Sequence, residues 1–65
     1  MSEQKKQRQT LIIRNIIDNL EAEHRNEMVY QNHKSSLDRN YQKADYIQLK
    51  IQGERAKLDF LVKEV

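Results

Sequence analysis

Apolar residues in the first half of the chain recur at the spacing of an amphipathic helix. At about 100° per residue they fall on one side of a helical cylinder, and charged or amide side chains cover most of the rest. Cations at Lys5 and Lys6 oppose the helix dipole near the start of the chain. We therefore expect a frayed basic arm at residues 1–6 and a first helix over about residues 6–31. Its apolar stripe consists of Ile13, Ile16, Ile17, Leu20, His24 and Met28.

A polar break at residues 31–36 divides the chain into two arms of nearly equal length. The break contains Asn, His and Ser, which form helices poorly, whereas the whole chain has no proline and only one glycine, Gly53. The run from Ser35 to Asp38 has the pattern of a capping box, in which these two side chains satisfy free amides at the start of a helix. We expect a turn over about residues 32–35 and a second helix over about residues 36–63.

The second arm carries apolar residues on two opposed faces. The first face can pack on the first arm, and it contains Leu37, Ala44, Ile47, Ile51, Leu58, Leu61, Val62 and Val65. A second row points about 200° away, given the 3.6-residue period of the helix. A helix that is apolar on two sides is usually buried on both. The second row is therefore the predicted interface with a partner or a second copy: Tyr46, Leu49, Gly53, Ala56 and Phe60.

These patterns predict an all-α fold, with residues 1–65 forming one antiparallel two-helix hairpin. A chain of about 60 residues buries only about 60% of the surface that it exposes when unfolded. The sequence has no cysteine for disulfides, so we expect dimerisation into a four-helix bundle. The alternative is a single long helix in a coiled coil. Polar residues on its seam weaken that alternative, namely Glu27, Gln31, Gln48 and Arg55.

Composition and charge favour a non-enzymatic role. The net charge is only +2, so strong attraction to nucleic acid or to a membrane surface is not predicted. No apolar run, residues 11–13 included, is longer than three residues, which is far too short to span a membrane. The chain has no cysteine nucleophile and no glycine-rich phosphate loop, so we predict no enzyme and no cofactor. We expect a small cytoplasmic regulatory or adaptor protein that contacts itself and an unidentified protein partner through its helices.

A nucleic-acid-binding hairpin dimer is the first alternative function. Tyr30 and Tyr41 lie near basic residues of the turn, and aromatic residues interleaved with cations can hold a nucleic-acid strand. Acidic residues at Glu27 and Asp38 dilute this charge. The candidate contacts are Lys5, Lys6 and Arg8 in the arm, and His33, Lys34 and Arg39 at the tip.

A metal-binding four-helix bundle is the second alternative function. Residues 21–24 contain the Glu-x-x-His spacing, which places two ligands on one helix face in di-iron and di-manganese bundles. The candidate ligands are Glu21, His24 and Glu54. His24 is equally well explained as a polar interruption of the bundle core that fixes its register.

Overall fold

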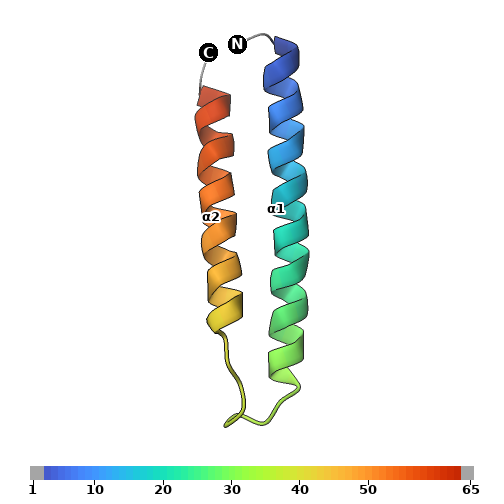
Figure 1. The fold of residues 1–65 in the computed structure, drawn as a ribbon, viewed down its shortest axis with the longest axis vertical. Helices are drawn as coiled ribbons and strands as arrows, with labels where there is room; N and C mark the ends of the chain where they lie inside the picture. The colour runs from blue at the N-terminus through green and yellow to red at the C-terminus, as the bar shows by residue number, and fades with distance from the viewer. Residues whose placement is uncertain (1–2, 64–65) are drawn as a thin grey trace.

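The structure is a computed structural model that describes residues 3–63, and it consists of two packed helices. Helix α1 (Glu3–Asn32) and helix α2 (Gln42–Lys63) run antiparallel and lie side by side along their length (Figure 1). The molecule measures 51 × 14 × 10 Å. Residues 3–63 contain no strand. The all-helical two-helix fold is confirmed, and the single long helix is wrong because the chain reverses between residues 33 and 41.

The core lies along the seam between the helices and uses most of the two predicted stripes. Its buried apolar residues are Ile17 of α1 and Ala44, Ile47, Ile51 and Leu61 of α2. Ile51 is the largest side chain that is fully buried. Half-buried side chains at Ile13, Leu20, His24, Met28 and Leu58 extend this seam. The buried face of each helix is therefore the one that the apolar spacing predicts.

Three members of the predicted stripes do not belong to the core. Ile16 is 38% exposed, at the edge of the α1 stripe. Val62 lies on the flank of α2 and is largely exposed. Leu37 is 96% exposed because it lies in the loop and not on the second helix. The remaining predicted member, Val65, lies outside the described residues.

The first helix begins earlier than the charge pattern predicts. Residues 3–6 are helical, and the predicted fraying is corrected for this segment. Glu3 supplies an acidic side chain in the first turn, where it opposes the unfavourable effect of Lys5 and Lys6 on the helix dipole. The rest of the predicted frayed arm, residues 1 and 2, lies outside the described residues.

The second helix begins at Gln42, so its predicted start at residue 36 is wrong. The Ser35 hydroxyl donates to the Asp38 carboxylate at 2.8 Å, and the Asp38 amide donates to the Ser35 carbonyl at 2.9 Å. These bonds close a turn within the loop instead of opening a helix. The first amide of α2, that of Gln42, donates to the side-chain oxygen of Asn40 at 2.9 Å. Asn40 therefore provides the cap that the sequence pattern assigned to Ser35.

Every carbonyl in the last turn of α1 has a hydrogen-bond partner. The His33 amide donates to the carbonyls of Val29 and Tyr30 at 3.1 and 3.3 Å, and the Lys34 amide donates to Gln31 at 3.1 Å. The Arg39 guanidinium donates to the Asn32 carbonyl at 3.2 Å. Helix ends normally leave four such carbonyls unpaired. Polar bonds thus hold the turn end, where apolar contacts are scarce.

Candidate interaction surface

The second apolar row of α2 lies on the outside of the hairpin. We call it the back stripe; Leu49 is 65% exposed and Phe60 is 69% exposed. Its other members are also exposed, namely Tyr46, Gly53 and Ala56. The Lys50 ammonium lies 4.7 Å from the centre of the Tyr46 ring.

Neither helix within residues 3–63 has both the length and the apolar content needed to cross a bilayer.

Gly53 has open space around it within the hairpin. A Cβ atom built at this position would meet no atom within 4 Å, apart from the local helix backbone. Glycine lowers the stability of a helix interior by about 1 kcal/mol relative to alanine. The hairpin itself therefore gives no packing reason for a glycine here, whereas a helix packed against the back stripe would benefit from the missing side chain.

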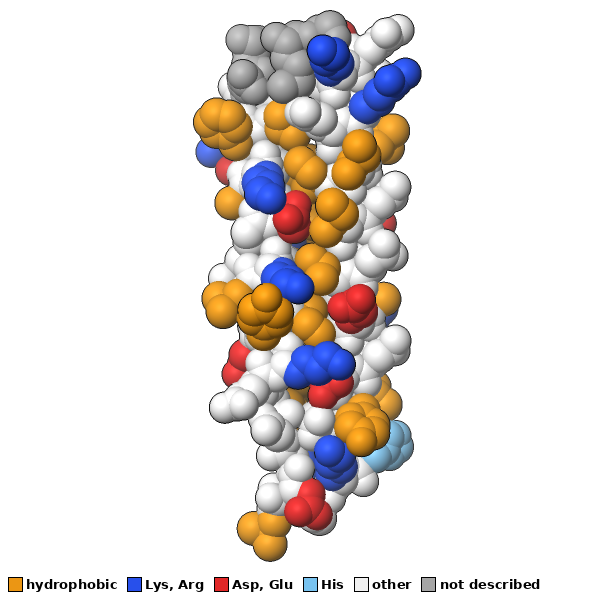
Figure 2. Space-filling view, viewed as in Figure 1, with side chains coloured by type: hydrophobic (Ala, Val, Ile, Leu, Met, Phe, Trp, Pro, Cys, Tyr) orange, Lys and Arg blue, Asp and Glu red, His pale blue; other side chains and the backbone are white. Residues whose placement is uncertain are grey.

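An apolar groove runs between the helices at the open end of the hairpin, where the described chain begins and ends. This open-end groove has a volume of about 680 Å³. It joins the C-terminal half of the back stripe to α1. Figure 2 shows apolar side chains gathered between the two helices in this region. The groove is lined by Ile12, Ile13, Ile16, Ala56, Phe60 and Leu61, with Gln9, Glu54 and Lys57 among them.

The sequence patterns did not identify the contribution of α1 to this surface. Ile12 belongs to neither predicted stripe, and Ile16 was assigned to the core. A usable signal was present in the run Leu11-Ile12-Ile13, because three consecutive residues span about 200° of a helix and cannot all face one partner. The candidate surface is therefore built from both helices.

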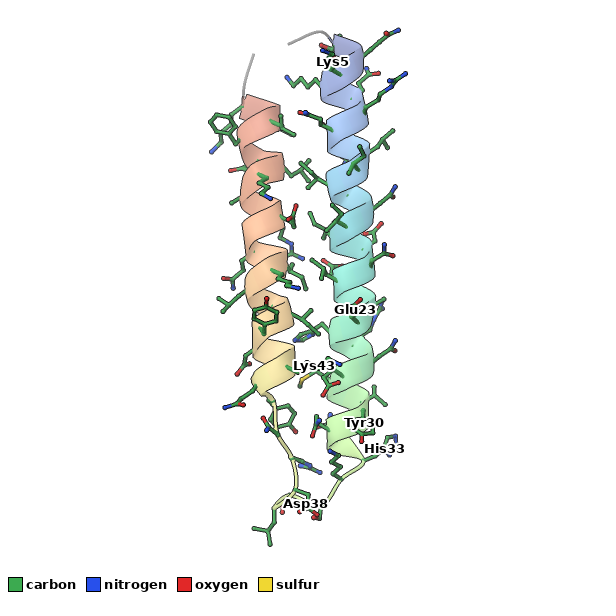
Figure 3. The ribbon with its side chains drawn as sticks, viewed as in Figure 1. Lys5, Glu23, Tyr30, His33, Asp38 and Lys43 are labelled. Carbon is green, nitrogen blue, oxygen red and sulfur yellow. The ribbon has the colours of Figure 1, made fainter. Side chains whose placement is uncertain are left out.

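Charged side chains of α2 beside the open-end groove form ion pairs. Lys57 lies 3.3 Å from Glu54, and Lys63 lies 3.2 Å from Asp59. Farther toward the turn, Lys43 of α2 reaches α1, where its ammonium lies 3.9 Å from the Glu27 carboxylate (Figure 3). Ion pairs therefore lie beside the groove and between the two helices nearer the turn.

The metal candidates do not form a ligand set. Glu21 and His24 line one shallow depression, but Arg55 lines it too and forms an ion pair with Glu21. Glu54 lies in the open-end groove and pairs with Lys57. Within residues 3–63, no three His, Asp or Glu side chains are grouped so that they could hold a metal ion.

The nucleic-acid candidates lie in two groups at opposite ends of the molecule. Lys5, with Lys6 and Arg8, is near the start of α1, and His33 is at the turn (Figure 3). Lys34 lies 4.6 Å from the centre of the Tyr30 ring. Arg39 is used to cap α1 through the carbonyls of Asn32 and Lys34. The two groups therefore do not make one continuous basic surface.

Comparison with protein families, with curated proteins and with solved structures gives no significant match for this chain. Inference about function therefore depends on the exposed surface itself.

Proposed function

We propose that this chain is a small non-enzymatic protein-interaction module, a regulatory or adaptor protein that acts through helix–helix contacts with itself and with a larger partner. One observation carries the proposal: α2 has two apolar faces, and only one of them is covered within the hairpin. Ile47 and Ile51 are buried on the first face, whereas Leu49 and Phe60 on the second are more than three-fifths exposed. Aligned large apolar side chains of this kind mark interaction sites.

Self-association accounts for the scarcity of core residues. Five apolar residues are buried within residues 3–63, while ten large hydrophobic side chains are exposed. A second hairpin packed on the back stripe gives a four-helix bundle with both copies of α2 inside. The small residues Gly53 and Ala56 permit close approach of the second helix, and Leu49 and Phe60 supply apolar area.

The test introduces a charge into the back stripe and measures mass. Leu49→Glu and Phe60→Glu should each lower the weight-average mass in sedimentation equilibrium over a wide concentration range, because a charge buried at an interface is costly. Gln52→Glu is the matched control, since it adds the same charge at an exposed position of α2 off the stripe. Far-UV circular dichroism of the dilute proteins checks that the hairpin remains helical.

The contact with a larger partner is tested with the same variants. Proteins retained by immobilised wild-type chain are compared with those retained by Leu49→Glu and by Gln52→Glu. The proposal predicts proteins that wild type and Gln52→Glu retain and that Leu49→Glu loses. If Leu49→Glu and Phe60→Glu match wild type in both mass and retained proteins, the back stripe is not a binding surface.

A further inference from the structure

Phe60 and the open-end groove form a projection and a recess on the same face of the hairpin. Phe60 lines the groove and is nevertheless 69% exposed, so its ring projects from the rim. Ile12 and Ile16 line the opposite wall and are also exposed. A surface that carries both a projection and a matching recess can pair with itself around a twofold axis, because each copy then fills the recess of the other.

The exposed area of the hairpin agrees with the size of such a contact. The chain exposes 5397 Å², whereas a compact monomer of this size exposes about 4,400 Å². The excess of about 1,000 Å² is close to the roughly 800 Å² that each partner buries in an interface of standard size. A second hairpin seated along this face would bring the exposed area of each copy near to that of a compact protein.

The charges beside the groove also fit a second copy. Glu54 lies 3.3 Å from Lys57 and Asp59 lies 3.2 Å from Lys63, so each of these acids of α2 has a base within reach. A twofold axis allows these acids of one copy to approach the bases of the other.

We propose that the open-end groove seats a second copy of this chain, with Phe60 of each copy packed between Ile12 and Ile16 of the other. This proposal rests on the interaction function proposed above and adds the α1 wall of the groove, at Ile12 and Ile16, to the self-association surface.

The test compares neighbouring exposed residues inside and outside the groove. Ile12→Ser and Phe60→Ser should each raise the dimer dissociation constant in sedimentation equilibrium by about tenfold or more, as expected for residues central to an interface. Leu11→Ser and Val29→Ser are the matched controls, because both side chains are about as exposed but lie outside the groove and outside the back stripe. They should change the dissociation constant by less than about threefold.

An equal mixture of isotope-labelled and unlabelled wild-type chains tests the contact without a substitution. Isotope-filtered NMR should give nuclear Overhauser effects between the Phe60 ring of one copy and the Ile12 and Ile16 methyl groups of the other. A dimer that loses affinity on Leu49→Ser but not on Phe60→Ser overturns this inference and leaves the proposed function intact. A wild-type chain that remains monomeric at millimolar concentration overturns it as well. The proposed function, in contrast, is overturned if Leu49→Glu and Phe60→Glu both match wild type in mass and in retained proteins.

Discussion

The backbone amide of Asn40 donates a hydrogen bond to the side-chain oxygen of Gln31 at 3.0 Å, and this bond joins the end of one helix to the start of the next. Gln31 is only 5% exposed and is the one buried polar residue of the described chain. Its amide nitrogen donates to Glu27 at 2.8 Å, so both ends of the side chain are occupied. Gln31 therefore closes the core at the turn end with hydrogen bonds in place of apolar packing.

Replacing Gln31 by alanine should destabilise the hairpin. The substitution leaves the Asn40 amide without its acceptor and should lower the free energy of unfolding by about 1–2 kcal/mol. Urea denaturation followed by circular dichroism measures this change. Hydrogen exchange by NMR gives a local check, because the Asn40 amide should exchange faster in the variant.

Gln52→Ala is the control for Gln31→Ala, since Gln52 is exposed near the middle of α2. Its unfolding free energy should stay within about 0.5 kcal/mol of wild type. Equal effects at the two positions would show that the Gln31 bonds do not stabilise the turn.

Asn40 and Ser35 give opposite predictions for the start of α2. Asn40→Ala removes the acceptor for the first helical amide and should lower the free energy of unfolding by about 1 kcal/mol. Ser35→Ala should cost less than about 0.5 kcal/mol, because its bond to Asp38 lies in an exposed loop. The same denaturation experiment applies to both variants. A larger effect at Ser35 would return the helix start to the position that the capping-box pattern predicted.

The start of α2, at the turn, is the part of the fold that the sequence pattern predicted incorrectly. Ser35 with Asp38 and Asn40 with Gln42 are both acceptable starts for a helix by local chemistry. The choice between them depends on tertiary bonds, since Gln31 and Arg39 hold residues 34–40 against the end of α1. Such bonds link residues up to nine positions apart, and no local spacing rule contains them.

The two helices and their seam were predictable because the 3.6-residue period acts along their whole length. Ile17, Ile47 and Ile51 are buried as that period requires. The open-end groove was only half predictable. Its α2 wall follows from the second apolar row, but its α1 wall uses Ile12, which lies on neither predicted stripe, and Ile16, which the spacing placed in the core.

Substitutions at Ile51 and Leu37 test which residues belong to the core, because the spacing placed both there and only Ile51 is buried. Ile51 is 1% exposed, so Ile51→Val should lower the free energy of unfolding by about 0.5–1.5 kcal/mol through loss of one buried methylene group. Leu37→Ala removes more apolar volume from a side chain that is 96% exposed and should change stability by less than about 0.5 kcal/mol. Thermal or urea unfolding of both variants measures the difference. A substantial loss at Leu37 would mean that the loop residue is buried in the protein as it exists in solution.

Gly53→Ala should change stability and association in opposite directions. Within the hairpin the new Cβ meets only open space, and alanine favours the helix, so the isolated chain should gain about 0.5–1 kcal/mol in unfolding free energy. In the dimer the same methyl group would keep a second helix from approaching the back stripe, so the dissociation constant should rise. Urea unfolding at concentrations below the dissociation constant measures the first effect, and sedimentation equilibrium measures the second.

Gln52→Ala, one residue away and off the stripe, is the control for Gly53→Ala. It should change neither quantity by more than the usual scatter of exposed substitutions, about 0.5 kcal/mol. A Gly53→Ala protein that is more stable and dimerises as wild type does would show that no helix approaches Gly53 closely, because a tight helix contact cannot accept the added methyl group without moving apart.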